Sequence, residues 1–318
     1  MTGGRAAPGA SVSLVLDSRK FPAGFPSSRM RATVFVNGMI RDAAAAVIPV
    51  FDHGFLYGEG IYETLRTYGR APFLFARHMR RLRRSASLMA LDVPFSDDEL
   101  LAHTRTTLEA HGGAAEAYIR ILLTRGVGEL TYNPNATPVP SLVIIVKDFP
   151  APAERTFTEG IRVSLVKIRR NHPAALNPAI KSNNLLNNAL AMQEALRHGA
   201  EEALMQNQAG ELVECSQSNF FIVRGGRAMT PPLDAGLLPG ITREFVLELA
   251  AELGVPAGDA RLTPADLATA DEAFITGTTR EVTPVVRVDD QMIGAGTPGP
   301  VSLQLLDLLR KRSRQEIV

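Results

Sequence analysis

The chain has 318 residues, of which 45% are hydrophobic, and its 34 basic and 33 acidic residues leave a formal net charge of +1. This composition is typical of a globular protein with one large or two modest domains, and it gives no general attraction to nucleic acid or to an anionic membrane. No apolar run approaches the ~20 residues that span a bilayer. The single cysteine, Cys215, excludes an intramolecular disulfide, and the six histidines show no metal-ligand spacing. We therefore expect a cytoplasmic protein with no metal site and no nucleic-acid or membrane partner.

The first half of the chain contains strand and helix patterns after an irregular start. Residues 1–29 are rich in Gly, Pro, Ser and Arg without periodicity, which predicts a disordered extension. A strand pattern, "ATVFVNG", leads into a turn at Asn37-Gly38 and a second strand, "AAAAVIPV", at 43–50. Further along, the patterns predict helices at 77–93 and 96–112 and strands at 117–126 and 140–149. Residues 30–149 are therefore predicted to form a small N-terminal α/β domain.

The second half begins after a proline- and alanine-rich stretch, "PAPAE", at 150–154. This composition is typical of a linker, so residues 150–158 are predicted to separate the first domain from a larger C-terminal domain at 159–318. The patterns there predict strands at 161–169, 272–277 and 282–288, helices at 182–198, 242–253 and 300–314, and a hairpin-like region at 201–232. Strands and helices mix without regular alternation, which indicates an α+β fold rather than a doubly wound sheet.

One lysine stands out in the segment "NPAIKSNNLLNNALAMQEA" at 177–195. Only five of the 34 basic residues are lysines, so arginine is the usual cation in this chain. A buried lysine can lose its proton and form a Schiff base, whereas arginine keeps its charge. Lys181 is therefore either a solvated charge at the start of a helix or a catalytic amine.

Two turns that contain glycine have the character of phosphate-binding sites. In "PGITRE" at 239–244 a Pro-Gly turn leads directly into an amphipathic helix, so the amides of Ile241 and Thr242 should point out of a helix N-terminus, where anions bind favourably. The alternative is that Thr242 only caps the helix. The stretch "ITGTTREVTP" at 275–284 is either a second such turn or an ordinary strand end.

Arginine also occurs where an anion would be the natural partner. The stretch "RHMRRLRRSA" carries arginines at mixed helical spacings, among them Arg77, Arg80, Arg81 and Arg84. Most of these side chains should be solvated, but one of them can turn inward to bind an anion. In "AYIRILLTRG", Tyr118 and Arg120 lie two residues apart and hence on the same face of the predicted strand. An arginine on an apolar strand needs an anionic partner unless that face lies in water.

Together these features fit a pyridoxal phosphate enzyme. The chain has no P-loop, GxSxG or HExxH motif, which leaves one unusual lysine, several turns suited to anions, and one acidic residue, Glu214, in a turn rich in Ser and Asn. An enzyme of this kind needs a lysine for the Schiff base, a site for the phosphate and a carboxylate for the pyridinium nitrogen.

Residues from about 33 to 310 resemble the class IV (fold-type IV) pyridoxal phosphate-dependent aminotransferase family, and seven stretches match it in the same order. They are "DHGFLYGEGIYETLR", "RHMRRL", "AYIR", "IKSNNLLNNALAMQEA", "GELVECSQSNFF", "LLPGITRE" and "EAFITGTTREVTPV". The family includes branched-chain aminotransferases, D-amino-acid aminotransferases and aminodeoxychorismate lyases. The resemblance implies a two-domain α+β fold with pyridoxal 5'-phosphate between a small N-terminal and a larger C-terminal domain, and a homodimer.

The resemblance also implies a role for each matching residue. Lys181 corresponds to the Schiff-base lysine that also shuttles the proton, and Glu214 corresponds to the carboxylate that pairs with the pyridine nitrogen. The phosphate-binding residues and the side chain packed on the ring would be Arg81, Ile241, Thr242, Thr278 and Leu238. The implied reaction is a ping-pong transamination, in which an amino acid leaves as a keto acid and a second keto acid, such as 2-oxoglutarate, takes up the amino group.

The motifs favour different members of the family. "AYIR" and "GVGELTYNP" resemble the branched-chain enzymes, in which the residues matching Tyr118 and Arg120 help to bind the distal carboxylate of glutamate. Other substrate-pocket positions are matched by Tyr57, Tyr62 and Thr279. Leu186, in contrast, stands where branched-chain enzymes commonly have a tyrosine that contacts the cofactor, which favours the D-amino-acid and lyase groups.

We therefore predict transfer of an amino group from a branched-chain L-amino acid to 2-oxoglutarate. A D-amino-acid or (R)-amine transaminase is the second candidate, and a lyase is the third because "GTTREVTPV" has the transaminase form. Two alternatives belong to other classes, a noncatalytic binding protein on the same fold and a nucleic-acid binder. The intact Lys181 and Glu214 argue against the first, and the near-neutral charge argues against the second.

Overall fold

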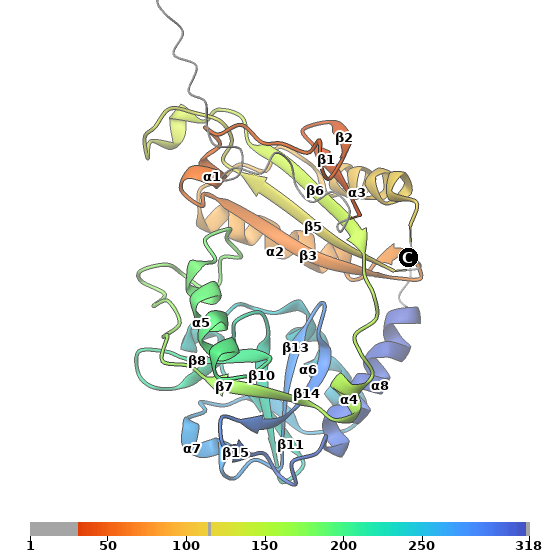
Figure 1. The fold of residues 1–318 in the computed structure, drawn as a ribbon, viewed down its shortest axis with the longest axis vertical. Helices are drawn as coiled ribbons and strands as arrows, with labels where there is room; N and C mark the ends of the chain where they lie inside the picture. The colour runs from red at the N-terminus through yellow and green to blue at the C-terminus, as the bar shows by residue number, and fades with distance from the viewer. Residues whose placement is uncertain (1–30, 114–115, 316–318) are drawn as a thin grey trace, which may run out of the picture.

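The structure, a computed structural model, describes residues 31–113 and 116–315 and divides them between two β-sheets (Figure 1). The extension predicted at 1–29 lies outside the described residues. The first sheet is formed by residues up to Asp148 and the second by residues from Ile161 onward, and the sheets lie one above the other in Figure 1. The predicted linker at 150–158 runs between them and contains the short helix α4, Arg155–Thr158. The division into two domains stays a prediction.

The first sheet has six strands in the order β2-β1-β6-β5-β3-β4, and all its pairings are antiparallel. The strands are β1 (Ala32–Val36), β2 (Met39–Asp42), β3 (Gly60–Tyr68), β4 (Ala71–Pro72), β5 (Ala117–Thr124) and β6 (Ser141–Asp148). Helices α2 (Phe75–Leu88) and α3 (Asp97–His111) pack on it, while α1 (His53–Leu56) and a 3₁₀ turn (Pro134–Ala136) lie in its loops. A single core of apolar side chains from β3, β5, β6 and the two long helices joins these layers.

Local sequence signals explain where helix α3 begins and ends. Ser96 caps the N-terminus of α3: its hydroxyl oxygen accepts a hydrogen bond from the amide of Glu99, and the Glu99 carboxylate accepts one from the amide of Ser96. Gly112 ends the helix in the left-handed conformation that glycine adopts without steric cost. The sequence prediction of a helix at 96–112 is therefore confirmed to within one residue at each end.

The second sheet follows the order β12-β11-β10-β13-β14-β7-β8-β9, with β15 paired to β14. Its strands are β7 (Ile161–Leu165), β8 (Glu202–Gln206), β9 (Leu212–Cys215), β10 (Asn219–Arg224), β11 (Arg227–Thr230), β12 (Ala257–Asp259), β13 (Glu272–Gly277), β14 (Glu281–Val288) and β15 (Gln291–Met292). The remaining elements are α5 (Leu186–Arg197), a 3₁₀ turn (Leu233–Ala235), α6 (Ile241–Glu252), α7 (Pro264–Leu267) and α8 (Pro300–Gln315).

Side-chain alternation along β10 separates the two faces of this sheet. Phe220 and Ile222 point into one apolar cluster, whereas Phe221 and Val223 point into the cluster beneath α6 and α8. The rings of Phe221 and Phe274 stack at 4.7 Å in that second cluster. Because both faces are covered, the strand reads as a continuous apolar run rather than an alternating one.

The α+β class predicted from the sequence is confirmed, but two elements of the first sheet differ from the prediction. Residues 43–50 do not form a strand; the second strand is β2, Met39–Asp42, directly after the Asn37-Gly38 turn. The turn pairs Met39 with Val36, so after four residues the pairing has run back to Thr33, next to the first residue of β1. The apolar pattern of the sequence also did not predict β3. This strand contacts residues of the second half of the chain, because Arg66 on β3 pairs with Glu281 on β14. Within the described residues, no helix is long and apolar enough to cross a membrane.

Candidate active site

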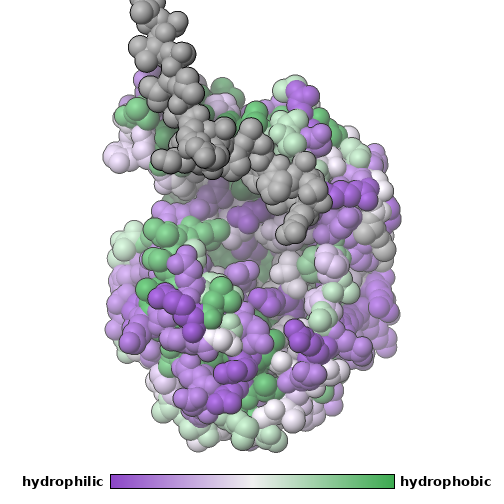
Figure 2. Space-filling view, in the orientation of Figure 1, coloured by the Kyte–Doolittle hydropathy of each residue, from purple (hydrophilic) through white to green (hydrophobic). Residues whose placement is uncertain are grey.

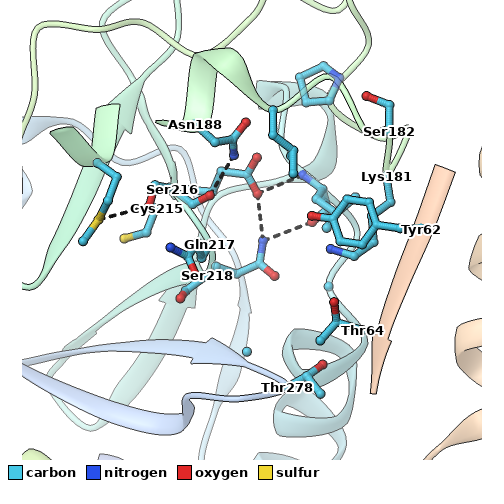
Figure 3. A pocket seen from close by; sticks show the side chains of 18 of the residues that line it. Tyr62, Thr64, Lys181, Ser182, Asn188, Cys215, Ser216, Gln217, Ser218 and Thr278 are labelled. Carbon is cyan, nitrogen blue, oxygen red and sulfur yellow. Dashed lines mark hydrogen bonds between the residues drawn. The ribbon is translucent and has the colours of Figure 1, made fainter. Parts of the chain in front are cut away.

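A cavity of about 590 Å³ lies between the two sheets and is lined by both halves of the chain. In Figure 3, Tyr62, Lys181 and Ser182 form one side, the turn from Cys215 to Ser218 forms another, and Thr278 lies at the base. The predicted site residues that line the cavity are Tyr62, Arg81, Tyr118, Arg120, Lys181, Glu214, Leu238, Ile241, Thr242, Thr278 and Thr279. The structure therefore brings together residues that the sequence places far apart.

Lys181 lies in the loop before α5 and is fixed to the first half of the chain by its backbone. Its amide donates to Ser85 Oγ at 3.1 Å, and its carbonyl oxygen accepts from the amide of Tyr62 at 2.9 Å. Its Nζ lies 4.5 Å from the centre of the Tyr62 ring. The ring thereby gives the amine a defined position inside the cavity, beside a face that attracts a cation.

Glu214, on β9, is held by donors at both carboxylate oxygens although only 5% of it is exposed. Oε1 accepts from Arg170 Nε at 2.7 Å, and Oε2 accepts from the amide of Leu238 at 3.0 Å and from Asn219 Nδ2 at 3.4 Å. Burial raises the pKa of Glu214 above its ordinary value, and the charge and hydrogen bond of Arg170 oppose that rise. The sequence does not single out Arg170, because nothing in the local pattern distinguishes this residue from the other arginines.

Two groups of donors are available for an anion at the base of the cavity. Helix α6 begins at Ile241 behind Gly240, which has no capping side chain, so the first amides of the helix stay open. A hairpin tip formed by Thr278, Thr279 and Arg280 joins β13 to β14 on the facing side. Thr276 also lines the cavity, and its hydroxyl is buried and has no hydrogen-bond partner among the described residues. An open helix N-terminus beside an unpaired donor fits a phosphate group.

Arg81 reaches the cavity from α2 in an orientation fixed by a buried carboxylate. Its Nε and Nη2 donate to the two oxygens of Glu63 at 2.8 and 2.7 Å, and Nη1 donates to the carbonyl of Pro239 at 2.9 Å. His78 Nδ1 lies 2.7 Å from the same carboxylate. Burial would raise the pKa of Glu63, but Arg81 and His78 outweigh it and lower the pKa to about 2. Glu63 is thus an anion at neutral pH and holds Arg81 in a single, charge-paired orientation.

One wall of the cavity carries an arginine whose Nε has no hydrogen-bond partner among the described residues. The Arg120 guanidinium lies 3.9 Å from the centre of the Tyr62 ring, and its buried Nε has no hydrogen-bond partner within the described chain. Tyr118 lines the cavity on the same face of β5, and its hydroxyl lies 3.5 Å from Thr64 Oγ1. The two-residue spacing predicted this shared face, and the cavity leaves the arginine accessible to an anionic ligand.

Two residues considered in the sequence analysis do not line the cavity. Tyr57 packs instead against Tyr132 and His53, with ring centres 5.1 and 4.9 Å away. Leu186 is the first residue of α5 and is 65% exposed. Asn184, Leu185 and Asn188 occupy the wall beside it. The position that made the subclass ambiguous therefore faces away from the cavity in this chain.

Comparison with known proteins agrees with the fold. A family model described as amino-transferase class IV matches residues 60–288. The chain belongs to the class IV aminotransferases and has their fold-type IV architecture. The resemblance seen in the sequence is thus confirmed, as is the enzyme class.

Within the family, the similar proteins include two kinds of aminotransferase. The chain is 38% identical over 272 residues to a putative branched-chain-amino-acid aminotransferase of Methanocaldococcus jannaschii, covering 86% of this chain and 93% of the relative. It is 32% identical to the D-alanine aminotransferase of Staphylococcus haemolyticus, covering 87% and 96%.

Among solved structures, the branched-chain amino acid aminotransferase of Escherichia coli superposes with a TM-score of 0.85 at 31% identity, covering 90% of this chain and 96% of that one. Another branched-chain amino acid aminotransferase, solved with pyridoxamine 5'-phosphate, also superposes with a TM-score of 0.85 at 31% identity, covering 89% and 94%. A second structure of that enzyme contains N-(5'-phosphopyridoxyl)-L-glutamate.

Proposed function

We propose that this protein is a pyridoxal phosphate-dependent transaminase that moves the amino group of a branched-chain L-amino acid to 2-oxoglutarate by a ping-pong reaction. One observation carries the proposal: an amine, a buried carboxylate and an open phosphate-sized set of donors meet in one cavity. The similar branched-chain enzymes and the pyridoxamine 5'-phosphate in one of them support it.

The residues present fit pyridoxal 5'-phosphate. Arg81, the open amides of Ile241 and Thr242, and Thr278 would hold its phosphate, and Glu214 would face its ring nitrogen. Leu238 would pack on the ring, since its amide is tied to the same carboxylate. When bound, this cofactor supplies a carbonyl that condenses with amines and a ring that accepts the electron pair left when the Cα proton departs.

Lys181 and Glu214 then have separate tasks. Lys181 Nζ, when neutral, would accept the proton of the substrate Cα and return it on the side of the cavity where Lys181 lies. Glu214 would pair with the ring nitrogen of the cofactor; burial raises the pKa of this carboxyl, and the charge and hydrogen bond of Arg170 oppose the rise. The amine and the carboxylate would thus act on different parts of the bound cofactor.

Substrate choice would depend on the cavity wall opposite the phosphate donors. Arg120 and Tyr118 would bind the distal carboxylate of glutamate and 2-oxoglutarate, because the unpaired guanidinium hydrogen there lacks any other acceptor among the described residues. Ile180, Leu176 and Leu185 supply apolar lining for a branched side chain. We infer that one pocket accepts both substrates in turn.

A D-amino-acid transaminase, with an (R)-amine transaminase beside it, is the second candidate. The likeness to D-alanine aminotransferases, which covers 87% of this chain, supports it. The test is a half-reaction of the holoenzyme with L-leucine, D-alanine or a chiral amine, following conversion of bound cofactor to its pyridoxamine form. L-Leucine should convert it and D-alanine should not; the opposite result would overturn the branched-chain assignment.

We also propose that the protein is a homodimer and that it is cytoplasmic, the latter from its cysteine content. Large apolar side chains are exposed in both halves of the chain, and Figure 2 shows apolar colour gathered over α5. They include Ile48, Phe51, Phe55, Leu130, Leu186, Leu190 and Leu196. A second copy would remove this surface from water, which is the main driving force for stable association. Light scattering of the purified protein tests the dimer, and a monomer would contradict it.

A further inference from the structure

Glu281 occupies a backbone position that ordinarily favours glycine. Gly277 pairs with Glu281 across β13 and β14, which leaves Thr278, Thr279 and Arg280 as a three-residue hairpin tip. In such hairpins the residue after the turn adopts the left-handed conformation, and Glu281 does so with φ at +52°. The chain therefore has a glutamate at a position where the backbone conformation favours glycine.

The carboxylate of Glu281 binds three side chains from two other elements. Arg66 Nη1 donates at 2.9 Å and Tyr68 Oη at 3.0 Å, both from β3 of the first sheet. Arg310, on α8, donates from Nε at 2.9 Å and from Nη2 at 2.7 Å. Glu281 is only 4% exposed, so these charge-assisted bonds are little screened by water.

The partners of Glu281 are themselves held in place. The Arg66 guanidinium lies over the rings of Tyr68 and Phe149, at 4.2 and 4.6 Å from their centres. Burial and the charge of Glu281 raise the pKa of Tyr68, so its phenol stays a donor. Arg310 lies over the ring of Phe157 at 4.2 Å. A fixed receptor for one carboxylate thus spans the first sheet and the last helix.

We propose that Glu281 is a positioning residue that sets the hairpin tip for phosphate binding by docking the strand behind it to the first half of the chain. The proposal rests on the proposed function, because it takes the Thr278 tip as part of the phosphate site. Glu281 does not line the cavity, whereas Thr278 and Thr279 do. Its effect on the cofactor is therefore exerted through the backbone of the tip.

The test is the rate at which pyridoxal phosphate leaves the holoenzyme during dialysis, with the melting temperature measured in parallel. Glu281→Gln keeps the left-handed residue but loses the charge, so release should be about tenfold faster. Tyr68→Phe keeps the ring over which Arg66 lies but removes one hydrogen-bond donor to Glu281. The rate of cofactor release should therefore increase less than in Glu281→Gln. Glu281→Gly favours the left-handed backbone conformation but removes every side-chain contact of Glu281. This variant should also release pyridoxal phosphate faster than the wild type.

Val285→Ala is the matched control. Val285 lies on the same strand, is 2% exposed and packs in an apolar core, so its truncation lowers stability without touching the docking contacts. Release from this variant should stay at the wild-type rate. Wild-type release from Glu281→Gln or from Glu281→Gly would overturn the proposal, as would equally fast release from Val285→Ala at the same melting temperature. A wild-type protein that takes up no cofactor would instead contradict the proposed function, and the proposal with it.

Discussion

At the scale of single residues, burial and an arginine act in opposite directions on one carboxyl group. Burial raises the pKa of Glu214, and Arg170 at 2.7 Å lowers it. Arg170 is itself anchored by Asn187 Oδ1 at 3.1 Å, at the start of α5. The charge state of Glu214 therefore depends on a residue that lies outside every recognised sequence motif.

Replacing this arginine should change the pH dependence of the reaction. In Arg170→Gln the pKa of Glu214 rises further, so the carboxylate is protonated at a higher pH than in the wild type. The acid limb of the pH profile of kcat/KM with L-leucine should move to higher pH. Arg169→Gln, which changes the exposed neighbouring arginine, is the control and should leave the profile in place. An unmoved acid limb in Arg170→Gln would show that the arginine does not tune Glu214.

Arg120 should distinguish the two substrates of the cycle. Arg120→Ala removes a cavity-wall guanidinium whose Nε has no hydrogen-bond partner among the described residues, and a lost charge-assisted hydrogen bond costs about 1.5–3 kcal/mol, or roughly tenfold or more in rate. The kcat/KM for 2-oxoglutarate should fall by that factor, whereas the half-reaction with L-leucine should change much less. Equal losses with both substrates would argue against the distal-carboxylate role.

At the scale of elements, the sequence predicted most helices and strands because their apolar periodicity reports burial directly. β3 escaped this reasoning because it buries charged residues: Glu63 pairs with Arg81, and Arg66 pairs with Glu281. Both partners are distant in sequence, so local pattern cannot show that these charges are satisfied. The strand expected at 43–50 is absent for another reason. Asp42 already pairs with Thr33 near the start of β1, so residues after Asp42 have almost no β1 residues left to pair with.

The start of α6 depends on a glycine that has no room for a side chain. A Cβ at Gly240 would lie 1.8 Å from Asn219 Oδ1, and Asn219 also bonds the carbonyl of Leu238 and the carboxylate of Glu214. The helix N-terminus and the carboxylate are thus packed as one unit.

Gly240→Ala should therefore disturb both the phosphate site and the ring site. Overpacking of this kind costs about 1–3 kcal/mol, and the variant should unfold at lower urea and bind pyridoxal phosphate more weakly. Gly258→Ala is the control, because its nearest neighbour, Arg227 Nη2, lies 3.8 Å from the added Cβ. If both variants bound the cofactor like the wild type, the close packing at Gly240 would be irrelevant to the site.

At the scale of the whole molecule, the cavity exists only because the two sheets face each other. Arg81, Tyr118 and Arg120 come from one half, whereas Lys181 and Glu214 come from the other. Motif order along the chain predicted the members of this set, since each matches a stretch of the family. It could not predict which side chains reach the cavity, and Tyr57 and Leu186 show that limit.

The most direct test of the account is to locate the amine that binds the cofactor. The chain has five lysines, at 20, 147, 167, 181 and 311. The holoenzyme, loaded with pyridoxal phosphate, would be reduced with borohydride, digested and analysed by mass spectrometry. We predict a phosphopyridoxyl group on Lys181 alone, and none in Lys181→Ala. A label on another lysine, or a protein that takes up no cofactor, would contradict the assignment of this cavity as the active site.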